Sequence, residues 1–171
     1  MNQFWKKIWD ICRLRAAPQD LPASLELVLL SVAGYFGIGI LISAAQLPLP
    51  TSLLAALVDV AMLLVASYVA LWVKLWPHRW YQMVTALAGS GAIIGFIALP
   101  IVVMQQSMGT ESPLLAIPEL IMIAIMVWNL LIIAHILRHT LALHMVVAGL
   151  FSGLYMYLSL RVITILFFTV E

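Results

Sequence analysis

Two charged side chains lie inside long apolar stretches of the sequence, where a charge without a partner is costly. Asp59 lies within residues 53–73, and Arg161 lies within residues 145–168. A charge near the centre of a membrane span costs about 2.5 to 3.5 kcal/mol on insertion scales. If both stretches leave the membrane at the same face, the two residues lie roughly 10 Å below that face. We therefore expect an ion pair, which either fixes the packing of two spans or forms a proton or substrate site.

Other partners for Arg161 stay open. Asn129 lies in the middle of the apolar stretch 117–137, and Glu119 lies near the start of that stretch. Asn129 is expected by default to make a hydrogen bond between helices. Arg161 has the further option of extending its side chain outward to lipid phosphates.

The histidines form a second group with chemical potential. His135 and His139 share a helical face, and His144 and His78 fall near the same membrane boundary. Two histidines at this spacing hold a metal when a carboxylate or a third histidine joins them. No acidic residue lies between His135 and His144, and Arg138 would repel a cation. We favour histidines that cap or hydrogen-bond a helix end over a metal site, and we predict no cofactor.

No catalytic motif or nucleic-acid footprint accompanies these residues. The sequence has no phosphate-binding glycine loop, no HExxH and no paired carboxylates at one depth. Its eight Lys and Arg residues against seven Asp and Glu residues give a net charge of +1. Nucleic-acid binding needs a concentration of positive charge that this chain lacks. We therefore predict a non-enzymatic protein with no nucleic-acid partner.

The elements that position these residues are membrane spans. Hydrophobic residues make up 65% of the chain and charged residues only 9%, against about a quarter charged in ordinary soluble domains. A span needs about 20 apolar residues. Five stretches meet that length, at residues 25–45, 53–73, 82–104, 117–137 and 145–168. The predicted fold is an all-α polytopic membrane helix bundle with five transmembrane helices over residues 25–171, preceded by an interfacial amphipathic helix.

The N-terminal residues 4–15 predict that interfacial helix. At helical spacing its apolar side chains gather on one side, and its cations lie elsewhere. The apolar side holds Phe4, Trp5, Ile8, Ile11, Cys12 and the stem of Arg15, and the other side gathers Lys6, Lys7, Asp10 and Arg13. The predicted membrane-surface cations are Lys6, Lys7, Arg13 and Arg15. The alternative is a helix that docks on a protein partner. Residues 1–24 are thus predicted as a cytoplasmic helix and linker, with Cys12 a free thiol packed at a helix face.

The distribution of basic residues predicts the orientation of the bundle. One face receives seven Lys or Arg residues and the short loops of the other face receive none, which favours the seven as cytoplasmic. The seven are Lys6, Lys7, Arg13, Arg15, Lys74, Arg79 and Arg138. We expect a bacterial inner-membrane protein with its N-terminus in the cytoplasm and its C-terminus in the periplasm.

Small residues predict where helices approach closely. Gly91 and Gly95 form a GxxxG motif in the third span, and Gly149 and Gly153 form another in the fifth. Such motifs let two backbones pack together in a membrane. Packing within the chain is the simpler expectation, and a face for a second copy or another membrane protein stays open beside contact with the lipid bilayer.

Several segments carry a resemblance to a known family, and they are residues 14–22, residues 82–89, Leu99 and Pro100, and Trp128 and Asn129 through residues 135–139. With the basic N-terminal segment and the five spans, they resemble the Yip (Ypt-interacting protein) domain family in small bacterial inner-membrane proteins. The resemblance implies a non-enzymatic five-span protein with a cytoplasmic N-terminus. Our first hypothesis is an assembly partner or membrane organiser. The alternative is a small transporter or channel subunit that uses Asp59 and Arg161.

Overall fold

The computed structural model describes residues 2–108 and 115–167 of the chain. This part is helical, with no strand, and two short 3₁₀ helices join longer α-helices. The elements are α1 (Asn2–Cys12), η1 (Pro18–Asp20), α2 (Leu25–Ala44), α3 (Leu49–Val73), η2 (Pro77–Arg79), α4 (Trp80–Ser107), α5 (Ala116–Leu141) and α6 (Met145–Phe167). Helices α2 to α6 are each long and apolar enough to cross a membrane. The predicted all-α fold with five spans is therefore confirmed.

Helix ends follow the local sequence. Pro50 falls in the first turn of α3 and Pro77 in that of η2, where proline costs no backbone hydrogen bond. Three helices extend beyond the predicted spans. Helix α3 begins at Leu49 rather than at residue 53, α4 runs from Trp80 to Ser107 rather than over 82–104, and α5 continues to Leu141 rather than to residue 137. The predicted end of the fifth span, Phe168, lies outside the described residues.

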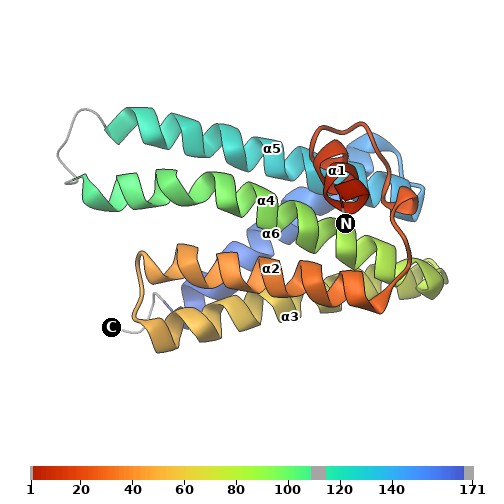
Figure 1. Cartoon of the computed structure of the whole chain (residues 1–171), viewed down its shortest axis with the longest axis horizontal. Coiled ribbons are helices and arrows are strands. Elements are labelled where there is room, and N and C mark those ends of the chain that lie inside the picture. The colour runs from red at the N-terminus through yellow and green to blue at the C-terminus, as the bar shows by residue number, and fades with distance from the viewer. Residues whose placement is uncertain (1, 109–114, 168–171) are drawn as a thin grey trace.

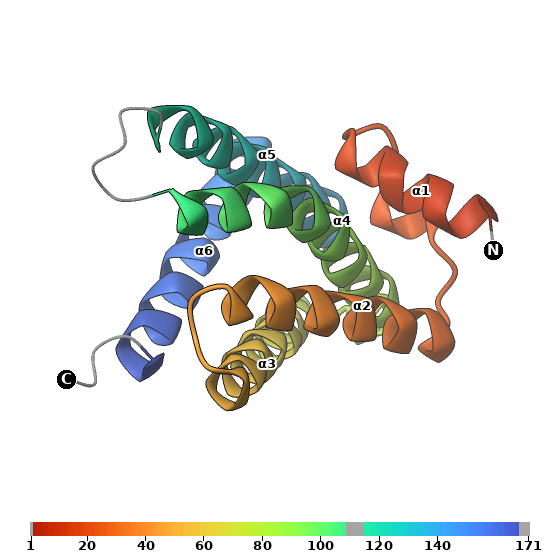
Figure 2. The same ribbon diagram turned by 60° about the vertical axis from the view of Figure 1, so that its left-hand side comes forward.

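The spans pack around α4. Helix α4 contacts both α2 and α5, α2 also contacts α3, and α6 contacts α5 and α3. In Figure 1, α6 runs obliquely behind the other spans, from the end of α5 toward the start of α3, and in Figure 2 its second half stands to the left of α2 and α3. Side chains of α6 are mostly exposed, and Ala148 and Ser152 are its buried residues.

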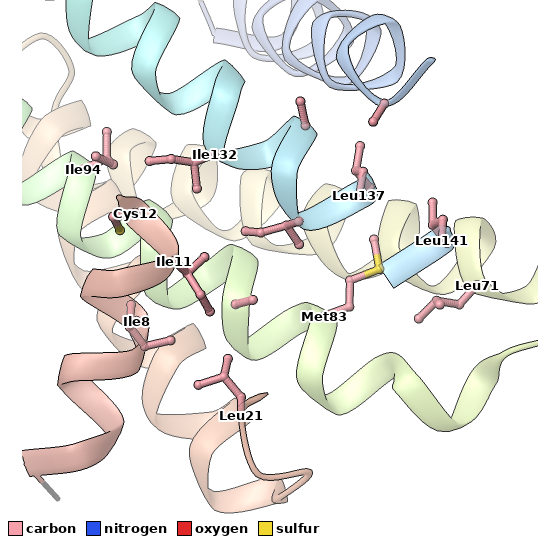
Figure 3. Close-up of a cluster of buried hydrophobic side chains, with 14 of the residues drawn as sticks. Ile8, Ile11, Cys12, Leu21, Leu71, Met83, Ile94, Ile132, Leu137 and Leu141 are labelled. Atoms are coloured by element: carbon pink, nitrogen blue, oxygen red, sulfur yellow. The ribbon is translucent and has the colours of Figure 1, made fainter. Parts of the chain in front are cut away.

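Helix α1 lies across the bundle rather than along it, and Figure 1 shows it nearly end-on. Its side chains Phe4, Ile8, Ile11 and Cys12 are buried in the same core cluster as residues of α4 and α5. Figure 3 shows Ile8, Ile11 and Cys12 facing this cluster. The predicted apolar side of the helix is thus covered largely by its own chain and not by lipid. Trp5 and Trp9 remain exposed.

The level of α1 agrees with an interfacial helix. Ile8 packs against Gly89, because a Cβ at Gly89 would lie 2.9 Å from Cδ1 of Ile8. A hydrocarbon core of ~30 Å is crossed by about 20 helical residues. Gly89 lies seven residues, or about 10 Å, from the start of the predicted span 82–104. Helix α1 therefore packs on the half of α4 nearer the predicted cytoplasmic face.

Candidate functional site

The predicted intramembrane carboxylate has partners that differ from those expected. The Tyr35 hydroxyl donates a hydrogen bond to Oδ2 of Asp59 at 2.5 Å, and the Ser159 hydroxyl donates one to Oδ1 at 2.9 Å. Tyr35 lies on α2, Asp59 on α3 and Ser159 on α6. One carboxylate therefore joins three spans through two hydroxyl donors.

A third hydroxyl belongs to the same region. Tyr155 lies one turn before Ser159 on α6, so the two residues share a face of that helix. The Tyr155 hydroxyl is buried and has no hydrogen-bond partner among the described residues. Buried hydroxyl groups usually have a partner, which in polar sites is often a bound water. The cluster of Asp59, Tyr35, Ser159 and Tyr155 thus holds one unused hydrogen-bonding group.

Gly91 makes the position of Tyr35 possible. A Cβ at Gly91 would lie 2.6 Å from Cε2 of Tyr35, which is closer than real side-chain contacts. Gly95 serves α2 in the same way, since its Cβ would lie 2.6 Å from Cγ2 of Ile38. The GxxxG motif of α4 is therefore a packing face within the chain, and it allows the Tyr35 ring to lie between two helices.

Arg161 does not form the predicted ion pair with Asp59. It is exposed on α6, and in the described part of the chain no salt bridge or hydrogen bond joins it to Asp59, Asn129 or Glu119. The reason is angular. Ser159 faces Asp59, and a residue two positions later on a helix points about 200° away. The Arg161 side chain therefore leaves α6 on a different side from the one that faces Asp59.

The remaining polar residues of the α5 span do not join this site. Asn129 is half-buried on α5, and Glu119 is exposed in the first turn of that helix. Neither side chain has a hydrogen bond within residues 2–108 and 115–167. The interhelical hydrogen bond expected of Asn129 is therefore not formed in this structure.

A second polar cluster fastens the N-terminal segment to the bundle, and we call it the N-terminal clasp. The Trp128 indole donates to the carbonyl oxygen of Cys12 at 2.9 Å. Gln82 donates to the carbonyl oxygens of Leu21 at 2.8 Å and of Gln19 at 3.2 Å. Segments 14–22, 82–89 and 128–139, which carry the resemblance to the Yip domain family, thus meet in one place.

The histidines belong to this clasp. Nε2 of His135 lies 3.0 Å from the carbonyl oxygen of Ala16, and because a carbonyl only accepts, this nitrogen carries the proton. The His135 and His139 rings lie 4.4 Å apart, and the Gln19 side chain donates to the His139 backbone oxygen. His144 is exposed before α6. Within the described residues, no three His, Cys, Asp or Glu side chains gather at one place.

The predicted membrane-surface cations lie around α1 and the segment that follows it. Lys6, Arg13 and Arg15 are exposed. Lys7 instead donates to the backbone oxygen of Asp20, next to the clasp. Burial raises the pKa of the neighbouring Cys12 thiol to about 12, and this cysteine is free and fully covered.

The second glycine motif differs from the first. Nothing lies within 4 Å of a Cβ built at Gly149, and at Gly153 the nearest atom is Cδ1 of Leu130 at 4.0 Å. Large apolar side chains beside these glycines are exposed, notably Val146 and Leu150. Packing within the chain therefore fills the GxxxG motif of α6 much less closely than that of α4.

Sequence reasoning missed Tyr35, Ser159 and Tyr155 at the intramembrane site and Gln82 at the clasp. The hydroxyl side chains within the spans were a signal, because such groups form hydrogen bonds with polar partners. Hydropathy alone does not show which face of the helix they occupy. Comparison with protein-family models, with curated proteins and with solved structures returns no match.

Proposed function

We propose that this integral membrane protein is a non-enzymatic assembly partner, which receives a helix of another membrane protein or of a second copy along α6. The observation that supports the proposal is the contrast between the two GxxxG motifs. The motif of α4 is filled by Tyr35 and Ile38 of the same chain, whereas Gly149 has open space beside it and Gly153 meets only Cδ1 of Leu130, at 4.0 Å from its Cβ. Small residues that let backbones approach are how helices associate in lipid.

The surface around these glycines suits a helix partner. Val146 is 65% exposed and Leu150 is 70% exposed, and Leu154 and Tyr157 continue the same exposed apolar face. Such side chains supply the van der Waals contact on which association in a membrane depends. Two shallow cavities, of about 580 Å³ and 430 Å³, are lined without any charged side chain. Neither provides the polar lining that a transport path would need.

We infer a bacterial inner-membrane location with the N-terminus in the cytoplasm. The seven loop and surface cations counted above lie on α1 and the segment after it, at the turn between α3 and α4, and in the last turn of α5. This asymmetry is the one that sets orientation. The resemblance to the Yip domain family agrees with the same topology. Reporter fusions at the two termini test the inference, and an N-terminal reporter active only outside the cytoplasm would contradict it.

The assembly role is tested by photocrosslinking in membranes. A photoreactive amino acid at Leu150 is expected to give a discrete protein adduct, because this side chain projects beside Gly149. The G149I/G153I variant should lose the adduct, because larger side chains prevent close approach. The matched control is Gly37→Ile on α2, since Gly37 also has nothing within 4 Å of its Cβ. Adducts with lipid alone, or an adduct unaffected by G149I/G153I, would contradict the role.

The small transporter or channel subunit remains the second candidate function, and one observation favours it. Asp59 lies in a span, and the neighbouring Tyr155 hydroxyl is buried with no hydrogen-bond partner in the part of the chain that the structure describes, as it would be beside a bound water. Asp59→Asn tests this candidate in proteoliposomes, since it removes the titratable group and keeps an acceptor oxygen. Proton or cation flux that depends on Asp59 would support transport, and flux at the background level would exclude it.

A further inference from the structure

An apolar groove lies beneath α1, on the side that faces along the spans toward the far end of the bundle. It has a volume of about 430 Å³ and is lined by Trp5 and Trp9 of α1, Gly34 and Ile38 of α2, and Ala92, Ile93, Phe96 and Ile97 of α4. Trp5 is 46% exposed and Trp9 is 41% exposed. The lining residues of α4 lie beyond Gly89, the level at which α1 packs. The groove is therefore at hydrocarbon depth.

The order of side chains around α1 explains why these tryptophans border the groove. At 100° per residue, Ile8 and Cys12 point into the core, and Trp5 and Trp9 lie just beside that buried face. Lys6 and Arg13 follow, about 60° further round, and both are exposed. Going round the helix, the order is buried core, tryptophan pair, then cationic pair.

This order matches the chemistry of an anionic phospholipid. Acyl chains require an apolar wall at hydrocarbon depth, and tryptophan rings favour the boundary below the headgroups. The headgroup phosphate requires cations at the membrane surface, which Lys6 and Arg13 supply. Lys7 does not take part, because it donates to the backbone oxygen of Asp20.

We propose that the groove under α1 binds one anionic phospholipid, with an acyl chain against Trp5, Trp9 and Phe96 and its phosphate between Lys6 and Arg13. This site is separate from the partner face on α6. The exposed cations on the adjoining side of α1 are what select this occupant. An uncharged helix would leave the paired cations unused, and a zwitterionic lipid would place its own cation beside them.

Native mass spectrometry of the purified chain tests the site. Phosphatidylglycerol and phosphatidylcholine with identical acyl chains are the probes. The wild-type protein should retain one phosphatidylglycerol in preference to phosphatidylcholine, a result that requires no variant to fold. K6Q/R13Q should lower phosphatidylglycerol retention roughly tenfold. K74Q is the matched control, because Lys74 is an exposed cation at the same end of the bundle and does not border the groove.

A second pair of variants separates the groove from general attraction to positive charge. W5A/W9A keeps both cations and removes one wall of the groove, so retention should fall in this variant also. The control is Trp72→Ala, because Trp72 is 64% exposed on α3, outside the groove. Equal retention of the two lipids by the wild type would overturn the proposal, as would equal losses in K6Q/R13Q and K74Q. A lipid-free dimer that dissociates in W5A/W9A would assign the groove to a second copy instead.

Discussion

Tyr35 donates its hydroxyl hydrogen to Asp59 across the boundary between α2 and α3, over a distance of 2.5 Å. This bond and the one from Ser159 replace the salt bridge that the sequence suggested. The carboxylate is therefore held by neutral donors, and its environment ties the packing of three helices to one side chain. The first two predictions follow from that arrangement.

Tyr35→Phe should destabilise the bundle by about 1 to 2 kcal/mol, because it removes a donor to a carboxylate and leaves the ring in place. The measurement is the free energy of unfolding in detergent micelles, titrated with sodium dodecyl sulfate. Tyr157→Phe is the matched control, since Tyr157 is 58% exposed on α6. Equal effects of the two substitutions would show that the bond to Asp59 contributes nothing.

Asp59 and Arg161 should behave independently in a double-mutant cycle. The effects of Asp59→Asn and Arg161→Gln on unfolding free energy are expected to add within about 0.5 kcal/mol, because the two side chains do not meet. For Asp59→Asn and Tyr35→Phe, the effect of the double variant should differ from the sum of the two single effects by about 1 kcal/mol. A coupling energy between Asp59 and Arg161 as large as that between Asp59 and Tyr35 would show that the ion pair does form.

The glycines of α4 and α2 should respond oppositely to alanine. Gly91→Ala is expected to cost about 1 to 3 kcal/mol, because its Cβ would lie 2.6 Å from the Tyr35 ring. Gly37→Ala should be neutral or stabilising by up to about 1 kcal/mol, because its Cβ meets open space and alanine favours a helix. The measurement is the free energy of unfolding of both variants in the same detergent. Similar changes in both would mean that Tyr35 moves aside freely.

The five spans could be predicted because membrane spanning depends on length and hydropathy, which a sequence states directly. The partner of Asp59 could not be predicted in the same way. Counting residues from a span end gives depth, but the direction in which Ser159 and Arg161 point depends on how α6 is rotated against α3. Helix rotation is set by packing, here by the contacts that α6 makes with α5 and α3.

The N-terminal helix shows the same limit. Its apolar side was evident, but a side suited to lipid is equally suited to a groove between helices. The structure covers Ile8 and Ile11 with α4 and α5 and leaves Trp5 and Trp9 to the surface. This helix is held in place by hydrogen bonds from Gln82 and Trp128. These bonds join positions far apart in the sequence, so no local pattern predicts them.

Cys12 should react very slowly with maleimide in the folded protein. Burial raises the pKa of its thiol from 9.0 to about 12, so at pH 8 the thiolate fraction is about 1,000-fold smaller than at an ordinary thiol. Since the folded pKa is the higher one, the associated stability is complete below pH 9 and is lost as the pH rises toward 12. A control thiol at the exposed position Ser107, in a Cys12→Ala background, should react at the ordinary rate. Equal labelling rates of Cys12 and the control thiol would show that α1 does not pack against the bundle.

Weakening the N-terminal clasp should expose Cys12 without unfolding the spans. Trp128→Phe removes the donor to the Cys12 carbonyl, and Gln82→Leu removes the donor to the carbonyls of Leu21 and Gln19. Each bond contributes about 1 kcal/mol, so we expect maleimide labelling of Cys12 to accelerate roughly fivefold in each variant, and more in the double variant. Trp72→Phe is the control, because Trp72 is exposed on α3. Unchanged labelling in the double variant would mean that apolar contacts alone hold α1 on the bundle.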